Sequence, residues 1–423
     1  MNIGLFFNDK GFSDLDLSTP VLGNNGVGGT QYCFLMLADA LAKYTDHNVI
    51  FYHYNKNILP QNVESHKIIA REEIITRAKE DSIDILIFKS EGINEFVKNL
   101  HKSDIHAIVW AHNYLYSEEL QEYCENPNIS RVVFVGHEMY DRYIDHPITK
   151  KATYIYNMFD GRAFTARQIP SSSSVTYTGS LIPAKGFLML ASVWKEIVQA
   201  VPDAQLYVIG NGKLYDRNAE LGAYGIAEKS YENQFMPFLT QNGHIMDNVH
   251  FLGTMGMEKV GIYEKTTVGV MNPTGKTETF GLSAVEMAAC GIPVVTKRAN
   301  GLYDTVINGK TGYLIRNKKE LARRIIELLN NKALNQRMGA NGKKFADSVF
   351  LPESIVEEWN VLFDNVMACK NSQPIQPSKH YLNNLKWLRV INRKLQNTGI
   401  KMKPIIDVEC AVRNVIRHKV RVR

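Results

Sequence analysis

Two glutamates in the second half of the chain stand in a pattern that can hold an anion and the hydroxyl groups beside it. Residues 277–295 read TETFGLSAVEMAACGIPVV, which places Glu278 ahead of a predicted helix and Glu286 about one turn inside it. If the helix begins near Gly281, its free backbone N–H groups and its positive dipole end form an anion site. The two carboxylates offer acceptors to hydroxyls on either side. A phosphate flanked by polyols is what a sugar nucleotide presents.

This stretch resembles the E-x7-E motif of the family 4 retaining glycosyltransferases, which have the two-domain GT-B fold. Other segments are similar to the same family. Residues 178–187 (TGSLIPAKGF) resemble its G-R-L-x-x-x-K-G turn, residues 206–212 (LYVIGNG) its L-x-I-x-G-x-G strand and turn, and residues 249–253 (VHFLG) its V-x-F-x-G strand. Residues 301–314 resemble the loop after its final strand. The resemblance covers about residues 1–370 and is strongest in the second half.

The resemblance implies a role for each matching residue. Lys185 would neutralise the donor diphosphate, Glu286 would hold the ribose hydroxyls, and Glu278 would contact the transferred sugar or support its phosphate loop. His112, just past a predicted strand, would face the reacting sugar, although a histidine at a strand end can equally be structural. The other donor-binding residues that the resemblance implies are Gly28, Gly29, Ser180, Gly210, Phe280, Gly281 and Leu282.

One position departs from the family pattern. Ser180 stands where the family usually has an arginine next to its lysine. A serine supplies one donor and no charge, so stabilisation of the diphosphate would rest more heavily on Lys185, with Lys276 or Arg298 as candidate helpers.

The chemistry implied by the resemblance is transfer of a sugar from a nucleoside-diphosphate sugar, with UDP or GDP as the expected nucleotide and retention of anomeric configuration. Such an enzyme would be a glycosyltransferase of the hexosyltransferase type, and it would need no metal ion and no cofactor. Its acceptor would be a glycan or a lipid-linked glycan in cell-surface polysaccharide synthesis. Departure of the leaving group builds negative charge on the diphosphate, so Lys185 and the helix N-terminus would act by electrostatic stabilisation.

The order of elements predicts an α/β protein with two doubly wound Rossmann-like domains facing across a cleft. Short apolar runs alternate with helical patterns, which is typical of parallel sheets. We expect an N-terminal acceptor-side domain at 1–165, a nucleotide-sugar donor domain at 166–350, and a helix at 351–370 that packs back toward the first domain. A basic amphipathic helical extension follows at 371–423. Predicted strands lie at 3–7, 48–52, 83–88, 107–110, 132–135, 153–156, 175–178, 205–209, 249–252, 267–271 and 292–296.

The composition excludes several protein classes. The chain has 423 residues, of which 45% are hydrophobic and 22% charged, so it is neither disordered nor collagen-like. Its five cysteines are far apart and form no C-x-x-C pair, which favours a reducing cytoplasm over a disulfide framework or zinc ribbon. The apolar start of the chain is too short for a signal peptide, and we expect no membrane span.

Charge is divided unevenly along the chain. Residues 379–423 contain twelve Lys or Arg and two acids, whereas the remainder contains 37 basic and 41 acidic residues. Two helical patterns in this tail carry apolar stripes, which are Tyr381, Leu385, Leu388, Ile391 and Leu395 in the first and Val408, Val412, Val415, Ile416 and Val420 in the second. We expect the tail to bind an anionic membrane surface and to hold the protein at the inner face of the membrane. The alternative is two helices whose stripes pack on the body; nucleic acid is disfavoured because no recognised binding fold accompanies the charge.

Two other functions stay open at this level. A non-catalytic sugar-nucleotide-binding or scaffold subunit would explain the serine at position 180. A dinucleotide-dependent oxidoreductase is disfavoured, because no complete G-x-G-x-x-G motif follows the first predicted strand.

Overall fold

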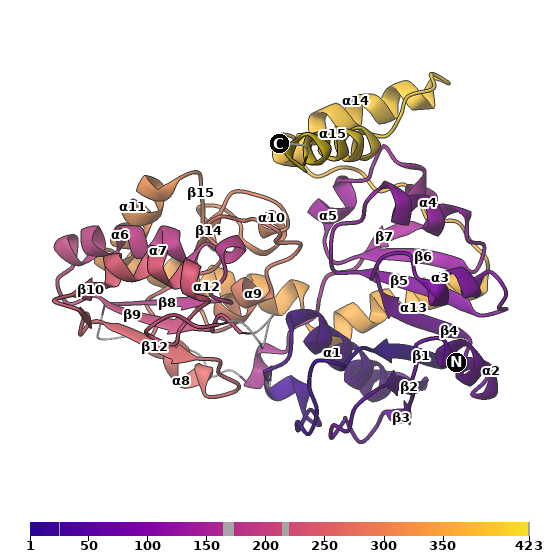
Figure 1. The fold of residues 1–423 in the computed structure, drawn as a ribbon, viewed down its shortest axis with the longest axis horizontal. Helices are drawn as coiled ribbons and strands as arrows, with labels where there is room; N and C mark the ends of the chain where they lie inside the picture. The colour runs from indigo at the N-terminus through magenta and orange to yellow at the C-terminus, as the bar shows by residue number, and fades with distance from the viewer. Residues whose placement is uncertain (25, 164–172, 214–219, 422–423) are drawn as a thin grey trace. The chain divides into compact units, whose positions relative to one another are not determined.

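The structure is a computed structural model that describes residues 1–24, 26–163, 173–213 and 220–421 (Figure 1). The chain forms two compact units. Unit 1 comprises Met1–Ser18, Leu37–Asn157 and Ile355–Arg423, and unit 2 comprises Thr19–Met36 and Met158–Ser354. Each unit holds one parallel sheet. No helix in the described ranges is long and apolar enough to cross a membrane.

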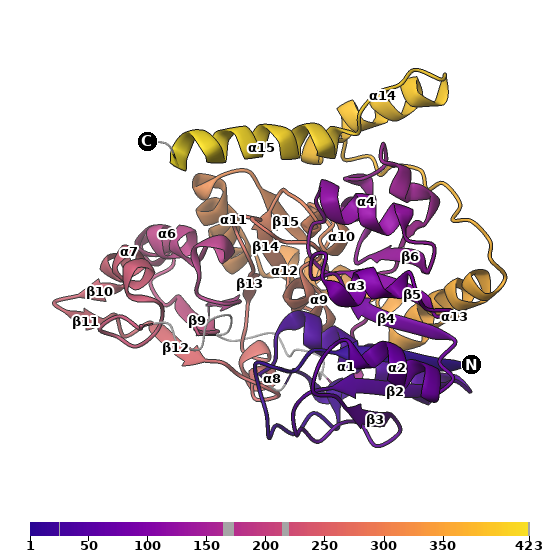
Figure 2. The same ribbon diagram turned by 45° about the vertical axis from the view of Figure 1, so that its right-hand side comes forward.

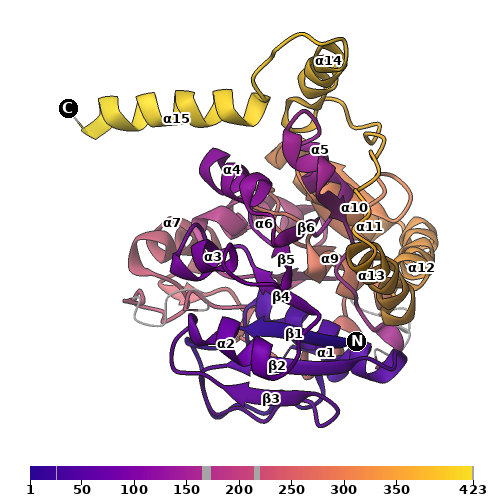
Figure 3. The same cartoon turned by 90° about the vertical axis from the view of Figure 1, so that its right-hand side faces the viewer.

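Unit 1 is built on a seven-stranded parallel sheet of order β3-β2-β1-β4-β5-β6-β7 (Figure 3). The strands are β1 (Asn2–Phe7), β2 (Asn48–His53), β3 (Glu64–Lys67), β4 (Ile85–Lys89), β5 (His106–Ala111), β6 (Ile129–Phe134) and β7 (Ala152–Tyr154). The inner strands are buried almost throughout, as apolar runs covered on both faces must be. β3 was not predicted, because its sequence ESHK is polar and lies at the sheet edge.

Helices of unit 1 flank this sheet, and two further helices follow at the C-terminal end of the chain. They are the second half of α1 (Gly29–Tyr44), α2 (Glu73–Glu80), α3 (Glu95–Leu100), α4 (Ser117–Glu125), α5 (His137–Asp141), α13 (Pro352–Met367), α14 (Lys386–Asn397) and α15 (Ile405–Arg421). α13 buries the face that its apolar spacing predicted. Its Trp359 ring lies 5.3 Å from that of Trp110 on β5, which fixes the helix against the sheet.

Unit 2 is built on a six-stranded parallel sheet of order β12-β9-β8-β13-β14-β15. The strands are β8 (Ser174–Thr178), β9 (Gln205–Ile209), β12 (Val249–Gly253), β13 (Val268–Val270), β14 (Val294–Lys297) and β15 (Gly312–Ile315). A short antiparallel pair joins β10 (Thr240–Gln241) to β11 (His244–Ile245). Residues 312–315 therefore form a strand that pairs with β14, which corrects the expectation of a loop in 301–314.

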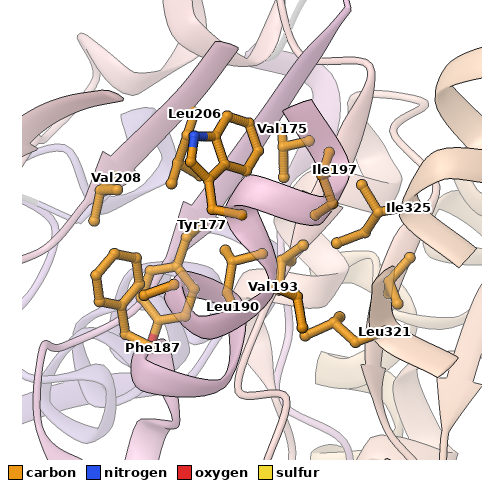
Figure 4. Packing of buried hydrophobic residues seen from close by; sticks show 14 of the residues in the cluster. Val175, Tyr177, Phe187, Leu190, Val193, Ile197, Leu206, Val208, Leu321 and Ile325 are labelled. Atoms are coloured by element: carbon orange, nitrogen blue, oxygen red, sulfur yellow. The ribbon is translucent and has the colours of Figure 1, made fainter. Parts of the chain in front are cut away.

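The core of unit 2 lies between this sheet and the helices packed on it (Figure 4). On one side, Leu190, Val193 and Ile197 of α6 lie over Val175 of β8 and face Ile325 of α11. The helices of the unit are α6 (Phe187–Ala200), α7 (Lys229–Leu239), α8 (Lys259–Tyr263), α9 (Leu282–Ala289), α10 (Leu302–Thr305), α11 (Lys318–Asn330) and α12 (Lys332–Val349). α6 follows β8 after a short turn, so the packing of this core fixes the turn that carries Lys185.

The tail forms the two predicted helices, α14 and α15, which lie at the β7 end of unit 1 near α5 (Figure 1) and near α4 (Figure 2). The side chains that α14 buries are not those of its apolar stripe. Lys386 and Arg389 are buried in α14, whereas the stripe residues Leu385 and Ile391 are exposed. The physical reason is a set of buried acids in unit 1 that pairs with these bases. Part of the positive charge of the tail is therefore neutralised by acidic side chains elsewhere in unit 1.

Candidate functional site

The E-x7-E segment lies in unit 2, after the carboxyl end of β13. Glu278 belongs to the loop after this strand and Glu286 lies on α9, which begins at Leu282 as the sequence predicted. Gly281 precedes the helix with φ +96°, a backbone conformation that favours glycine, and a Cβ there would lie 2.9 Å from Leu302 Cδ2. The loop thus reaches the helix N-terminus by a turn that needs this glycine.

Glu278 is held by a lysine from another loop and by an amide from its own loop. Lys185 Nζ lies 2.7 Å from Glu278 Oε2, and Asn272 Nδ2 donates to the same oxygen at 2.9 Å. Lys185 ends the short 3-10 turn Pro183–Lys185 after β8, and Asn272 follows β13. The structure therefore brings together two predicted site residues that are distant in sequence, and it adds Asn272, which the sequence analysis did not single out.

α9 begins where the sequence analysis places a helix start, and the anion site at this start stays a prediction. The positive dipole end of α9 lies at Leu282. Of the N–H groups in the first turn, that of Ala284 donates to the Gly281 carbonyl at 2.9 Å. The loop before the helix is fixed by its own contacts. Phe280 packs edge-on against Phe350 with ring centroids 5.5 Å apart, and the carbonyl of Phe280 accepts a hydrogen bond from Thr305 Oγ1 at 3.3 Å. These contacts hold the loop backbone in place before any ligand arrives.

Glu286 lies deeper than Glu278 and has partners that the sequence did not reveal. Lys259 Nζ lies 2.7 Å from Glu286 Oε2, and the Tyr263 hydroxyl donates to the same oxygen at 3.3 Å. Both partners come from α8, a five-residue helix without a motif that would have marked it. Burial, reinforced by the Glu286 charge, raises the pKa of Tyr263 well above its ordinary value and that of Cys290 to about 12. Both groups are therefore neutral near pH 7.

Ser180 and Gly210 lie in two turns that touch each other. The N–H of Gly179 donates to the carbonyl of Ile209 at 3.0 Å, and the N–H of Leu181 donates to the carbonyl of Asn211 at 3.0 Å. A Cβ at Gly210, which has φ +131°, would lie 2.1 Å from the Gly179 oxygen. Gly210 is thus required for this close approach, and Ser180 is buried beside it.

The glycine pair at the start of α1 belongs to unit 2. Asn24 shapes the loop before it, donating from Nδ2 to the Val27 carbonyl at 2.8 Å and accepting from the Val27 N–H at 2.9 Å. A Cβ on Gly28 would meet Gln31 Oε1 at 2.5 Å, whereas no atom lies within 4 Å of a Cβ placed on Gly29. The donor-binding roles of Gly28 and Gly29 stay predictions.

His112 lies in unit 1, directly after β5. Its ring centroid is 4.5 Å from that of Trp110, and the side chain is buried. Burial, together with the charge of Lys89, lowers the pKa of His112 to about 3, so the imidazole is neutral near pH 7. A neutral ring can donate one hydrogen bond and accept another, and it carries no charge. Its role toward a sugar stays a prediction.

Comparison with known proteins finds a family model that matches the part of the chain that contains this site. Residues 167–345 match the family model described as Glycosyl transferases group 1. The group 1 segment contains Lys185, Glu278, Glu286 and their partners Asn272 and Lys259. Within the described ranges, no group of three or more His, Cys, Asp or Glu side chains is placed to hold a metal ion.

Curated relatives match this chain over half of its length or less. An uncharacterized glycosyltransferase of Methanocaldococcus jannaschii is 31% identical over 172 residues, which is 40% of this chain and 42% of the relative. The capsular polysaccharide biosynthesis glycosyltransferase CapM of Staphylococcus aureus is 28% identical over 195 residues, which is 46% of each chain. The chain spans about half the length of the curated relatives it matches.

Solved structures match over nearly the whole chain and establish the fold. Sucrose-phosphate synthase from Thermosynechococcus elongatus superposes with a TM-score of 0.65 at 18% identity, covering 88% of this chain and 100% of that one. HepE of Anabaena in complex with UDP-glucose gives a TM-score of 0.63 at 16% identity, covering 86% and 100%. The protein has the GT-B glycosyltransferase fold with a helical C-terminal extension, as predicted.

Proposed function

We propose that this protein is a retaining glycosyltransferase that moves a sugar from a nucleoside-diphosphate sugar to a glycan or lipid-linked acceptor. The observation that carries the proposal is the Lys185–Glu278 pair, Nζ to Oε2 2.7 Å, beside the N-terminus of α9 within the group 1 segment. This arrangement joins a cation, a carboxylate and a helix dipole where one donor molecule can meet all three.

Lys185 and the α9 N-terminus supply the electrostatic part of the chemistry. Cleavage of the sugar–phosphate bond leaves additional negative charge on the diphosphate, and positive groups already in position stabilise that charge without reorganisation. Glu278 holds the Lys185 ammonium group in place, and Asn272 in turn fixes the Glu278 carboxylate by donating to its Oε2. A diphosphate would compete with Glu278 for Lys185, which leaves the carboxylate available to a sugar hydroxyl. Ser180 adds a hydroxyl but no charge, so Lys185 carries this task.

Glu286 would bind the ribose, with Lys259 and Tyr263 fixing its carboxylate. Both partners donate to Oε2. A carboxylate held by an ammonium group and a hydroxyl has its position set by them, and its remaining acceptor sites suit the vicinal hydroxyls of a ribose. We propose that this step needs no metal ion. UDP is favoured by the structural match to HepE bound to UDP-glucose, and GDP by relatives named as GDP-mannose-dependent mannosyltransferases.

The acceptor side is proposed from the relatives. CapM is named for capsular polysaccharide biosynthesis, and other relatives are named as mannosyltransferases acting on phosphatidylinositol monomannosides. We propose a role in cell-surface polysaccharide assembly on the cytoplasmic side of a membrane, with His112 near the reacting sugar.

A thermal-shift screen of the purified protein against UDP, GDP, ADP and dTDP and their sugar conjugates tests donor binding. A ligand that binds only the folded protein raises its apparent stability, so one diphosphate should give a specific shift. Glu286→Ala should abolish this shift, whereas Glu220→Ala, an exposed glutamate of the same unit, should retain it. Absence of a shift with every nucleotide at millimolar concentration would contradict the donor site.

The reaction itself is tested with the donor so identified. Proton NMR of the product should show the anomeric configuration of the donor, and turnover should persist in EDTA. An inverted product would contradict the retaining mechanism, and loss of turnover in EDTA that a divalent ion restores would contradict metal independence. Nucleotide binding without any transfer, by contrast, would favour a scaffold subunit.

A further inference from the structure

The C-terminal helix α14 turns basic side chains inward and apolar side chains outward. Lys386 and Arg389 are buried, with exposed fractions of 2% and 0%. Trp387 and Ile391, which are one turn apart on the opposite side of the helix, are 46% and 45% exposed. A helix packed on a body in water ordinarily shows the reverse arrangement.

Buried acids of unit 1 hold α14 in this orientation. Lys386 Nζ lies 2.9 Å from both carboxylate oxygens of Glu138 and 2.6 Å from Asp141 Oδ2. Arg389 lies 3.8 Å from Asp145, which also accepts from Asn392 Nδ2 at 2.8 Å. Rotating α14 to bury its apolar side would leave three buried carboxylates without cationic partners, which is strongly unfavourable. The outward apolar side is therefore fixed by ion pairs within unit 1.

α15 also exposes apolar side chains. Val408, Val412, Val415 and Ile416 share one side of this helix by their spacing, and all four are exposed. The first turns of α15 contact the rest of unit 1, because Ile406 is buried and Glu409 Oε2 lies 2.8 Å from an Arg142 nitrogen. From Ala411 to Ile416 the helix is exposed on all sides. We use the name apolar tail face for six exposed side chains, which are Trp387 and Ile391 of α14 and Val408, Val412, Val415 and Ile416 of α15.

The exposed charges of the tail itself have one sign. Within the described side chains of residues 379–416, every exposed charged side chain is a lysine or an arginine. The two acids of the segment are not among the exposed residues, and one of them, Glu409, pairs with Arg142. The exposed bases are Lys379, Lys394, Lys401, Lys403 and Arg413. An apolar surface on a tail whose own exposed charges are all positive complements a partner that is apolar beneath an anionic layer.

We propose that the apolar tail face docks into the headgroup region of an anionic phospholipid bilayer. Tryptophan and aliphatic side chains on one side of an interfacial helix enter the boundary between headgroups and acyl chains, while lysines attract anionic lipid. A second copy of this chain, docked face to face, would set these positive borders against each other. The tail helices would lie in the headgroup region and would not span the bilayer. This inference is independent of the glycosyl transfer proposed above.

Tryptophan fluorescence gives a direct test, because the four tryptophans of the chain differ sharply in exposure. Trp110, Trp194 and Trp359 are buried, and Trp387 is exposed. Adding vesicles of phosphatidylcholine with phosphatidylglycerol to the full chain should shift the emission to the blue, and brominated lipid should quench it. Trp387→Phe should remove the shift while the protein still binds. An unchanged wild-type spectrum with vesicles present would overturn the proposal.

Cosedimentation with the same vesicles tests the face as a whole. The double variant Ile391→Glu/Val415→Glu should lower the bound fraction at least about tenfold, because it places carboxylates in the proposed contact. The matched control Ile58→Glu/Ile69→Glu changes two exposed isoleucines elsewhere in unit 1 and should bind like the wild type. Circular dichroism verifies that both variants fold.

Three results would contradict the proposal. One is equal binding of the Ile391→Glu/Val415→Glu variant and the wild type, with salt removing all binding, which would mean that charge alone acts. Another is binding of the wild type to vesicles of pure phosphatidylcholine that equals its binding to vesicles containing phosphatidylglycerol. The third is a wild-type dimer that the variant loses while neither protein binds vesicles, which would assign the face to a second copy of the chain.

Discussion

Lys259 and Glu286 form an ion pair inside unit 2, with Nζ 2.7 Å from Oε2 and only 6% of each side chain exposed. The pair joins α8 to α9 and thereby fixes the carboxylate proposed to bind ribose. A buried charge that loses its partner is far more costly than a buried pair.

Removing one partner of this pair should therefore destabilise the protein. We expect Lys259→Ala to lower the free energy of unfolding of unit 2 by about 3–5 kcal/mol. The double variant Lys259→Met/Glu286→Gln should recover much of this loss, because it leaves no unpaired charge. Urea unfolding followed by circular dichroism measures both. A single variant as stable as the wild type would show that the pair is not shielded from water.

Lys185 should matter for turnover more than for stability, because its pair with Glu278 is partly exposed to solvent. We expect Lys185→Ala to reduce kcat/KM by about a hundredfold or more, the usual scale for losing a preorganised charge at a developing anion. The free energy of unfolding should fall less than in Lys259→Ala, because the Lys185 side chain is 18% exposed and that of Lys259 only 6%. Lys195→Ala, an exposed lysine of α6, is the matched control. Full activity in Lys185→Ala would refute its assigned role.

Gly210 should not tolerate a side chain. Its φ of +131° and the expected Cβ distance of 2.1 Å from the Gly179 oxygen mean that Gly210→Ala must separate the turns after β8 and β9. We expect a loss of at least about 2 kcal/mol in the free energy of unfolding and weaker donor binding. Gly261→Ala on α8 has no atom within 4 Å of its Cβ and should leave stability unchanged or slightly higher. Equal melting temperatures for the two variants would contradict this interpretation.

The buried His112 should make stability depend on pH. Its pKa is about 3 in the folded protein and has the ordinary value of 6.5 in the unfolded chain, so between these values the unfolded chain binds a proton that the folded chain does not. The free energy of unfolding should therefore fall as the pH drops below about 6.5, with His112 contributing a loss of about 1–2 kcal/mol at about pH 5.

His112→Asn isolates this contribution from that of other buried histidines such as His146, whose pKa burial also lowers. Urea unfolding at pH 7 and pH 5 should show a smaller difference for His112→Asn than for the wild type. His244→Asn, at an exposed position of the β10–β11 pair, should behave like the wild type. A wild-type difference retained in full by His112→Asn would mean that His112 is protonated in the folded protein.

Much of the fold follows from local sequence. Apolar runs such as residues 107–110 predicted inner strands because a parallel sheet covered on both faces selects continuous apolar residues. The spacing of Ile355, Trp359 and Phe363 predicted the buried side of α13 for a similar reason. The strand at 64–67 escaped prediction, since an exposed edge strand needs no apolar side chains.

The candidate site was predictable only in part. Glycines and the glutamate pair mark the turn before α9 because backbone geometry there restricts the residue type. Lys259 carries no such local signal; its significance comes from Glu286, which lies 27 residues away in sequence. The pairing of Lys185 with Glu278 over 93 residues is likewise a product of the sheet that brings their loops together.

The tail shows most clearly which properties are local and which are not. Local sequence was enough to establish that residues 386–397 and 405–421 form basic amphipathic helices, because helical periodicity is a local property. It could not establish which side faces the body, since that choice depends on Glu138, Asp141 and Asp145, more than 240 residues from the bases they pair with. Folding of the whole chain places these buried carboxylates under α14. Because leaving them unpaired would be more unfavourable than exposing Trp387 and Ile391, electrostatics rather than apolar burial fixes the outward face of this helix.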